Sequence, residues 1–540
     1  MLKWLHRESK SIVSAAIIIA AFSFLSRFVG LIRDRILAGE FGAGTVLDSY
    51  YAAFKVPDFL FSLIVVGSLS ASFIPLFAKY YHDKHSEKEA WAFTNRALHL
   101  VLGTMFLLVI VMLIFAPQLA KLVAPGFDGV RLKMTTEFLR IMLVSQLFLT
   151  VSMIYGSVLQ ATKRFLFYSM APILYNGGII VGALAFVPLM GPKGLAWGVV
   201  FGAAAHMVLQ IVGVHLLGYR YKIDLAIRDS DVLEMIRLAG PRMLGVGVGQ
   251  IMYVLFTVLA TTLALGSVTI FQFAYNIQFF PVGLIGVSYA IAAFPAFAES
   301  FAKGDNDRIR DTFQTSMKQI IFFLVPLTLL FMVFRAQIVR VVVGAGGFGW
   351  EETLLTADTL AFFALSFIPQ SAVFILARVY FAARDTLTPL VAGLVSTLVG
   401  FLAALWLKPT FGVVSLGMAF SIASFVNMIL LWVPLRQRFG SLGEAKMLRT
   451  IYTVSFAGII TGIVMQVGKM WWGGLISPDT FITVFLQAAI PGTIGFAVYA
   501  LISFLLKSDE LNFFMHGIRR KLFKRFEPEE TVTTETQGGV

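Results

Sequence analysis

The stretch IVSAAIIIAAFSFLSRFVGLIRD, residues 12–34, decides the fold class, because a long apolar run ends there in charged residues. Lys3, Arg7 and Lys10 precede the run, which is the charge order of a signal peptide, but no small-residue cleavage site follows it. About 20 apolar residues are enough for a helix to cross the hydrocarbon core of a bilayer. We therefore interpret this stretch as the first membrane helix.

The rest of the chain has the same apolar character. Of its 540 residues, 58% are hydrophobic and 14% are charged, whereas soluble proteins carry about 25% charged residues; the mean hydropathy is +0.83. This composition excludes a cytosolic enzyme, a secreted disulfide scaffold and a nucleic-acid-binding domain. The net charge of +13 fits loops that face anionic lipid heads. We expect membrane lipids, and no nucleic acid, as partners.

Apolar windows of similar length recur as far as Leu506, separated by short breaks marked by Gly, Pro or charge. They predict an all-α polytopic membrane protein of about fourteen transmembrane helices, because the runs are continuous and do not alternate as barrel strands do. The expected spans are 11–38, 46–78, 92–116, 135–160, 168–190, 194–218, 235–264, 268–298, 315–340, 357–383, 387–407, 412–435, 448–468 and 481–506.

The charges of the connecting loops set the expected orientation. With the N-terminus inside, the inner connections hold about twenty Lys or Arg residues and the outer ones about ten, and positive charge prefers the inner side. We therefore expect both termini in the cytoplasm.

Short strings recur about 220 residues apart, an offset that matches six helices. Gly44-Thr45-Val46 returns as Gly266-Ser267-Val268, and the string 75–78 returns as 295–298. Chance similarity among apolar strings is the alternative, but the common offset favours a duplication. Two halves in the same orientation are typical of parallel-repeat transporters, whose substrate site lies between the halves. The expected division is an N-terminal six-helix lobe (1–225), a C-terminal six-helix lobe (226–445), two additional helices (446–507) and a cytoplasmic tail, basic and then disordered (508–540).

The first expected helix concentrates ionisable residues, which are costly inside a membrane and therefore candidates for function. Ser23, Arg27, Gly30 and Asp34 are spaced to lie on one stripe of a helix, with Ser26 and Arg33 on an adjacent stripe. At about 1.5 Å per residue from Ile12, Arg27 lies roughly 22 Å into a core roughly 30 Å thick. We interpret Arg27 as lining a cavity.

Two other groups leave alternatives open. Arg33 and Arg35 lie near the far boundary of the first helix, where arginine side chains can also reach the outer interface. On the second helix, Lys55 and Asp58 either neutralise each other across one turn or leave Lys55 facing the cavity. The span 268–298 has no Lys, Arg or Asp. The cavity is therefore expected to be basic mainly on its N-terminal side.

A basic pocket within a membrane protein indicates an anionic substrate, because the planar guanidinium matches phosphate oxygens bidentately. Other motifs are weak. The glycines at 245, 247 and 249 fall in an expected helix, and a dinucleotide loop needs a strand before it. The chain has no cysteine and no HExxH motif. We expect neither an enzyme, nor a cofactor, nor a metal site.

Several strings resemble the MurJ/MviN family of lipid II flippases, within the multidrug/oligosaccharidyl-lipid/polysaccharide exporter superfamily. The most specific is Ser26-Arg27-Phe28-Val29-Gly30-Leu31-Ile32-Arg33-Asp34. Others follow in order as far as the eleventh span, and they are Phe41-Gly42-Ala43-Gly44, Asp48, Ala53-Phe54-Lys55-Val56-Pro57, Ala124-Pro125-Gly126-Phe127, Arg164-Phe165, Ala171-Pro172-Ile173-Leu174, Asn176, Gly240-Pro241, Gly245-Val246-Gly247-Val248-Gly249-Gln250, Phe280-Pro281, Tyr380-Phe381-Ala382, Asp385-Thr386 and Thr388-Pro389.

The resemblance implies a transporter in the bacterial cytoplasmic (inner) membrane. It would move lipid II, a polyprenyl-pyrophosphate-linked peptidoglycan precursor, from the inner to the outer leaflet by alternating access. Arg27 and Arg33 would meet the pyrophosphate, and the last two helices would shape a groove for the polyprenyl tail. The source of energy, an ion or the membrane potential, stays open. The substrate-binding residues expected beside the two arginines are Ser26, Asp34, Asp48, Lys55 and Asn276.

The chain also departs from the family pattern. Phe61 and Ser62 stand where relatives carry an arginine, Asn276 stands near the place of another, and Val66 replaces a glutamate. Half of the expected cationic cluster is thus absent, which puts the cargo in question and leaves the fold untouched. The alternatives are an exporter of another lipid-linked oligosaccharide or polysaccharide, and a membrane scaffold that does not transport.

Overall fold

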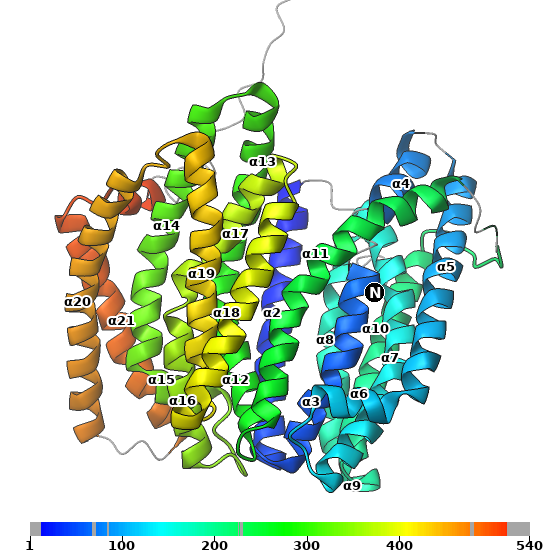
Figure 1. Cartoon of the computed structure of the whole chain (residues 1–540), viewed down its shortest axis with the longest axis horizontal. Helices are drawn as coiled ribbons and strands as arrows, with labels where there is room; N and C mark the ends of the chain where they lie inside the picture. Colours follow the sequence, from blue (N-terminus) through cyan, green and yellow to red (C-terminus); the bar gives the residue numbers. More distant parts are fainter. Residues whose placement is uncertain are drawn as a thin grey trace, which may run out of the picture.

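The structure is a computed structural model that describes residues 12–66, 72–83, 86–224, 226, 230–475 and 480–515. Within these ranges every regular element is helical and no strand occurs, which confirms the predicted all-α class (Figure 1). The expectations for the first 11 residues and for the tail beyond residue 515 lie outside the described residues.

The helices follow one another with short connections, as the Gly, Pro and charged breaks in the sequence predict. Their bounds are α2 (Ile12–Phe41), α3 (Thr45–Phe61), η1 (Ser62–Val66), α4 (Ile74–Ala78), η3 (Lys79–Asp83), α5 (Glu87–Ile114), α6 (Ala116–Val123), α7 (Gly129–Ala161), α8 (Phe165–Val181), η4 (Gly182–Phe186), α9 (Val187–Met190), α10 (Lys193–His215), α11 (Ser230–Thr261), α12 (Ser267–Pro281), η5 (Val282–Val287), α13 (Ser288–Lys303), α14 (Asn306–Val333), α15 (Arg335–Val342), α16 (Trp350–Ala364), α17 (Phe367–Ala382), α18 (Leu387–Phe411), α19 (Val414–Phe439), α20 (Glu444–Leu475) and α21 (Phe481–Leu505).

Among the described residues, ten helices are long and apolar enough to cross a membrane, or eleven if α16 and α17, bent by 47°, form one span. The other three expected spans coincide with α2, α3 and α11. Helix α3 is 17 residues long, and the side chains of residues 12–17 in α2 and 240–248 in α11 lie outside those that the structure describes. The number of fourteen crossings therefore stays a prediction.

The helices form two groups with α2 and α11 between them (Figure 1). Helices α3 to α10 lie on one side and α12 to α19 on the other, called here the first and second halves, with α2 assigned to the first and α11 to the second. Helix α2 packs on α8, and α11 packs on α18. Helices α20 and α21 lie at the edge and contact α14 and α15. The division into folding units stays a prediction.

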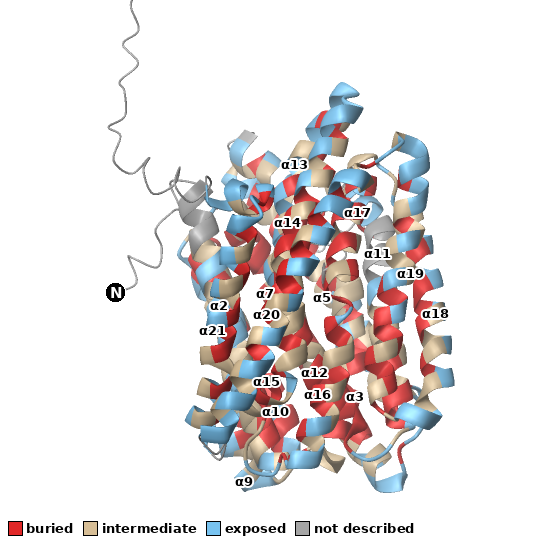
Figure 2. Ribbon diagram, turned by 90° about the vertical axis from the view of Figure 1, so that its left-hand side faces the viewer, coloured by how far each residue is buried: buried red, intermediate tan, exposed pale blue. Residues whose placement is uncertain are grey.

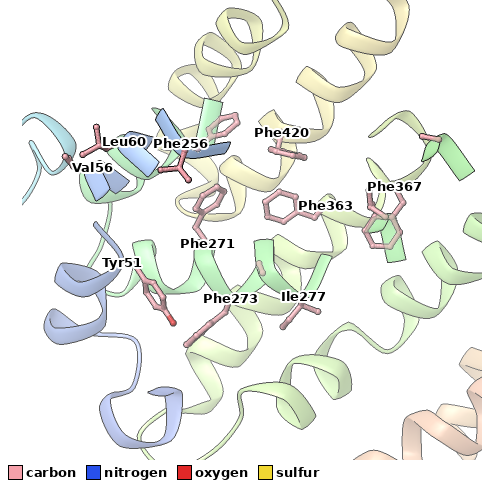
Figure 3. Close-up of a cluster of buried hydrophobic side chains, with 14 of the residues drawn as sticks. Tyr51, Val56, Leu60, Phe256, Phe271, Phe273, Ile277, Phe363, Phe367 and Phe420 are labelled. Carbon is pink, nitrogen blue, oxygen red and sulfur yellow. The ribbon is translucent and has the colours of Figure 1, made fainter. Parts of the chain in front are cut away.

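An aromatic cluster around α12 forms part of the core between the halves (Figure 3). Phe271 lies 5.9 Å from Phe363 and 6.1 Å from Phe256, between ring centroids. On the opposite side of α12, the Phe273 ring meets Tyr51 of α3 at 5.8 Å. Edge-to-face and tilted rings of this kind stabilise a core beyond the area that they bury. Helix α12 is thereby fixed between both halves.

The outward faces of the helix bundle are apolar, as a lipid solvent requires. Buried residues gather in the interior, while exposed ones lie at the two ends and along the outer faces (Figure 2). Large apolar side chains such as Trp406, which is 80% exposed, and Leu189, which is 81% exposed, face outward. A soluble monomer rarely exposes apolar surface on this scale.

The two halves pack backbone against backbone at the end that holds the loops 42–44, 124–128, 262–266 and 343–349, called the outer end after the predicted orientation. Four glycines there lie so near the other half that an added Cβ would be less than 3.0 Å from its backbone. The Gly347 N–H also donates to the Gly39 carbonyl at 2.7 Å. The outer end is closed. The four glycines are Gly42, Gly126, Gly266 and Gly346.

Three helices next to the junction contain wider π-helical turns. These turns are η1 after α3, η4 after α8 and η5 after α12. A π-turn is rare, often marks a functional site, and changes the direction of the side chains that follow it. In η5, the turn brings Gly283 against the side chain of Arg27.

Candidate functional site

The charged stripe of α2 faces the second half of the molecule. The Arg27 guanidinium lies over the Phe279 ring, 5.8 Å from its centroid, and next to Gly283. Arg27 is an exposed residue midway along α2. Among the described residues it has no ion-pair partner. The guanidinium is therefore turned toward the junction between the halves with its donors available.

Arg33 and Asp34 form an ion pair that both halves hold in place. The Arg33 Nη2 lies 2.7 Å from Asp34 Oδ1, and Nε donates to the same oxygen at 3.0 Å. Arg33 Nη1 donates to Asn176 Oδ1 of α8 at 2.9 Å. The other oxygen of Asp34 accepts from Asn276 Nδ2 of α12 at 2.9 Å. This arrangement excludes outward snorkelling for Arg33, because the guanidinium is bound inside the bundle.

Asn176 also determines how α2 sits on α8. Its amide Nδ2 donates to the Pro172 carbonyl at 3.1 Å and to the Ser26 carbonyl at 3.5 Å. A Cβ added at Gly30 would lie 4.0 Å from the same amide group. Ser26 thus takes part through its backbone. The stripe of Ser26 and Arg33 faces α8, as does Gly30 at the edge of the other stripe, while Arg27 and Asp34 face α12.

Lys55 is buried, with 3% exposure, and its partner is a neutral amide of the other half. Its Nζ donates to Gln272 Oε1 at 3.0 Å and lies 3.7 Å from the centroid of the Tyr253 ring. The Tyr253 hydroxyl donates to the same amide oxygen. Gln272 Nε2 then donates to Asn276 Oδ1 at 2.8 Å. An amide chain therefore connects Lys55 to Asp34.

Asp58 does not pair with Lys55 at contact distance, although the spacing allows it. Asp58 is exposed, and it interacts electrostatically with both Lys55 and Arg33. The two alternatives for Lys55 are thus resolved in an unexpected way: its ammonium group binds an amide and a ring, while the carboxylate of Asp58 stays nearby. The centre contains three cations and two carboxylates, all from α2 and α3, which leaves one positive charge in excess.

Asp48 and Arg35 lie away from this centre and hold the outer end together. Asp48 accepts hydrogen bonds from the Gly266 N–H at 2.8 Å and from the Thr269 N–H and hydroxyl at 2.9 and 2.7 Å. This carboxylate caps the N-terminus of α12, where the helix dipole favours an anion. Arg35 Nη1 donates to the carbonyls of Arg340 and Val341 at 3.2 and 2.7 Å.

Gln272, Tyr253 and the role of Asn176 in this centre are not evident from the sequence patterns. Gln272 precedes Asn276 by four residues, so the two lie on one face of a helix. That spacing was the available signal. A polar pair on an otherwise apolar membrane helix indicates a buried network. Tyr253 had no comparable signal, because it lies in an apolar stretch of α11.

Chemically, the centre can bind an anion. Arg27 presents guanidinium donors without an ion-pair partner among the described residues, and Arg33 of the same helix is held by Asp34 and Asn176. Guanidinium forks match phosphate oxygens. Within the described residues, no three His, Cys, Asp or Glu side chains gather as metal ligands do.

The chain is similar to known proteins along nearly its whole length. The profile of the family described as "Lipid II flippase MurJ" matches residues 37–500. A "Probable lipid II flippase MurJ" of Buchnera aphidicola subsp. Acyrthosiphon pisum is 26% identical over 518 residues, 93% of this chain and 99% of the relative. One of the same name from Rhizobium tropici is 24% identical over 95% of this chain and 97% of the relative.

Solved structures show the same fold. "Lipid II flippase MurJ, inward closed conformation" has a TM-score of 0.75 at 22% identity and covers 91% of this chain and 99% of its own. An inward-facing multidrug resistance MATE family transporter of the MOP superfamily has a TM-score of 0.65 at 15% identity, over 79% of this chain and 99% of its own. The chain is a multi-pass membrane protein, and it belongs to the lipid II flippase MurJ family.

Proposed function

We propose that this protein flips lipid II from the inner to the outer leaflet of the bacterial inner membrane by alternating access, with both termini in the cytoplasm. One observation carries the proposal: the Arg27 guanidinium, midway along a membrane helix, faces the junction of the halves without an ion-pair partner among the described residues. An uncompensated charge at this depth costs several kcal/mol. A bound pyrophosphate offsets that cost.

In this proposal Arg27 and Arg33 hold the pyrophosphate, and Lys55 adds a third positive charge beside them. Asp34 keeps Arg33 oriented, while Asn276 and the Ser26 backbone complete the polar lining. Asn276 replaces a family arginine with a neutral amide, so the head is held mainly by the first half. Both carboxylate oxygens of Asp48 accept hydrogen bonds from the N-terminus of α12, so this residue would not bind the head group in this conformation.

The closed outer end supports the proposed cycle. Release to the outer leaflet requires that the halves part where Asp48 caps α12, where Arg35 binds two carbonyls and where Gly39 meets Gly347. None of these contacts is an ion pair between the halves. The polyprenyl tail stays in the bilayer beside α20 and α21 while the head crosses.

Complementation of a flippase-depleted bacterium tests the proposal. We expect rescue by the wild-type chain and none by Arg27→Ala, because the variant removes the free fork. Arg449→Ala, an exposed arginine at the start of α20, serves as the matched control and should rescue fully. Membrane insertion of each variant is checked by immunoblot.

Two results would overturn the proposal. If the inserted wild type does not rescue, lipid II is not the cargo, and binding of other polyprenyl-pyrophosphate glycans then identifies the alternative exporter. If Arg27→Ala rescues as well as the wild type, Arg27 does not hold the head group. A scaffold would show no Arg27-dependent binding of any of these lipids.

A further inference from the structure

Two adjoining cavities lie between α15 and α21, away from the charged centre. The first, of about 390 Å³, is lined by Arg340, Trp350, Gln337 and Gln487 among others. The second, of about 280 Å³, continues along α21 past Phe485 and is lined mostly by apolar side chains. Gln337 lines both cavities. Together they form a space with a polar end and an apolar end.

The polar end has groups that the protein itself leaves unsatisfied. Gln337 is 9% exposed, and its Oε1 has no hydrogen-bond partner, although its Nε2 donates to Gln487 Oε1 at 3.2 Å. A buried polar atom without a partner is costly unless a ligand or water reaches it. The Arg340 guanidinium stacks on Trp350 at 5.6 Å and has no ion-pair partner among the described residues.

The position of the cavities fits the head-group level of a membrane. Trp350 and Trp471, at this end of the molecule, are 55% and 66% exposed. Tryptophan gathers where the hydrocarbon core meets the head groups. Arg340 therefore lies at the depth of a lipid phosphate, and the apolar cavity extends from it toward the bilayer centre along α21.

We propose that these cavities bind one anionic glycerophospholipid, with its phosphodiester at Arg340 and Gln337 and one acyl chain along α21. A single guanidinium matches the single charge of a phosphodiester, whereas a pyrophosphate carries more. Basic pockets between membrane helices bind lipid head groups in this way. The site also borders the outer closure, because Arg35 donates to the carbonyls of Arg340 and Val341.

The test measures binding of phosphatidylglycerol to the purified full chain in detergent by native mass spectrometry, with zwitterionic phosphatidylcholine as the comparison. We expect Arg340→Gln to weaken the binding of phosphatidylglycerol about tenfold or more, which is the fold-change for a lost charge-assisted hydrogen bond. The binding of phosphatidylcholine should weaken much less. Arg335→Gln is the matched control on the same helix, because Arg335 pairs with Asp358 and lines neither cavity.

A second variant tests the apolar end. Gly492 lines the second cavity, and an added Cβ would lie 3.1 Å from Leu330 Cδ1. Gly492→Leu should therefore fill this space and weaken the binding of both phosphatidylglycerol and phosphatidylcholine. The proposal is overturned if Arg340→Gln binds phosphatidylglycerol like the wild type, if Arg335→Gln loses as much, or if undecaprenyl phosphate displaces phosphatidylglycerol at equal concentration. Unchanged Arg27-dependent binding of lipid II by each variant shows that it is folded.

Discussion

The two halves contribute different chemistry to the junction between them. The first half supplies charges: Arg27 and Asp34 on α2 and Lys55 on α3. The second half contacts these charges with neutral groups. Gly283 and Phe279 lie near Arg27, Asn276 binds Asp34, and Gln272 binds Lys55. The outer end follows the same rule, because the carboxylate of Asp48 binds peptide N–H groups and Arg35 binds carbonyls.

This asymmetry makes the junction separable. Arg33 pairs with Asp34 within the first half, and Asp58 of the same half interacts with Lys55, so parting the halves splits no ion pair at this centre. A hydrogen bond between a charged group and a neutral partner contributes about 1.5–3 kcal/mol, whereas breaking a buried ion pair costs about 3–5 kcal/mol. At the opposite end, Lys79 lies 3.9 Å from Asp231 of the other half, and their ion pair does cross the junction.

The largest expected effect comes from removing Asp34, the carboxylate that pairs with Arg33 within the first half. Asp34→Ala leaves the Arg33 guanidinium, 21% exposed, without its countercharge. We expect the free energy of unfolding to fall by about 3–5 kcal/mol, measured by denaturant titration in detergent. Asp34→Asn keeps one of the two acceptor oxygens and should lose about 1–3 kcal/mol. Equal losses in the two variants would show that the charge does not matter.

The cap on α12 should come next. Asp48→Ala leaves the N–H groups of Gly266 and Thr269 without their acceptor. We expect a loss of about 2 kcal/mol and greater labelling of cysteines introduced near the outer end, because that end opens more often. Asp48→Asn retains an acceptor oxygen, so its stability and its cysteine labelling should lie between those of Asp48→Ala and the wild type. Labelling that stays at the wild-type level argues against a closure role.

Introducing a charge into the second half would break the asymmetry directly. Asn276→Arg places a guanidinium of the second half beside Asp34 and adds a positive charge to the proposed head-group site. We expect lipid II affinity to rise about tenfold, as one added charge-assisted hydrogen bond gives. Titration at fixed ionic strength measures it, with Asn276→Gln as the neutral control. An equal rise with glutamine would attribute the effect to side-chain length.

A double-mutant cycle measures the contact between Lys55 and Gln272. Lys55→Met and Gln272→Leu each remove one partner of the 3.0 Å hydrogen bond. We expect a coupling energy of about 1 kcal/mol in unfolding experiments, within the usual range for residues in contact. Additive losses would mean that the Tyr253 ring, and not the amide, holds the ammonium group.

The smallest effect concerns the space beside Arg27. An added Cβ at Gly283 would lie 2.8 Å from Arg27 Nη1, so Gly283→Ala displaces a flexible side-chain end. We expect a change in unfolding free energy of about 0.5 kcal/mol or less, together with a measurable loss of lipid II affinity. Gly103→Ala, where the added Cβ would meet nothing within 4 Å, is the control. Equal lipid II affinities of Gly283→Ala and Gly103→Ala would show that Gly283 does not belong to the ligand site.

The part of the centre that depends on one helix could be predicted from the sequence. The spacing of Arg27 and Asp34 places both on one stripe, and the structure directs both toward α12. The absence of Lys, Arg and Asp from the span 268–298 likewise predicted that the second half would be neutral. Helix periodicity alone determines these features.

Partners on other helices could not be predicted in this way. Lys55 has a carboxylate three residues away, yet it binds Gln272, 217 residues further along the chain. Asp48 caps a helix of the other half. These choices depend on how whole helices pack, and the π-turn of η5 changes the side-chain directions after Pro281 in a way that no local pattern indicated.

The glycines at the outer end have a consequence for engineering. Gly42, Gly126, Gly266 and Gly346 each leave no room for even one methyl group against the opposite backbone. Alanine at Gly126 would act as a wedge that prevents the halves from meeting, whereas at Gly42, Gly266 and Gly346, with φ of +61°, +87° and +48°, it would also strain its own loop. Such single-atom spacers offer a way to hold the transporter open toward the outside and to trap that state for structural study.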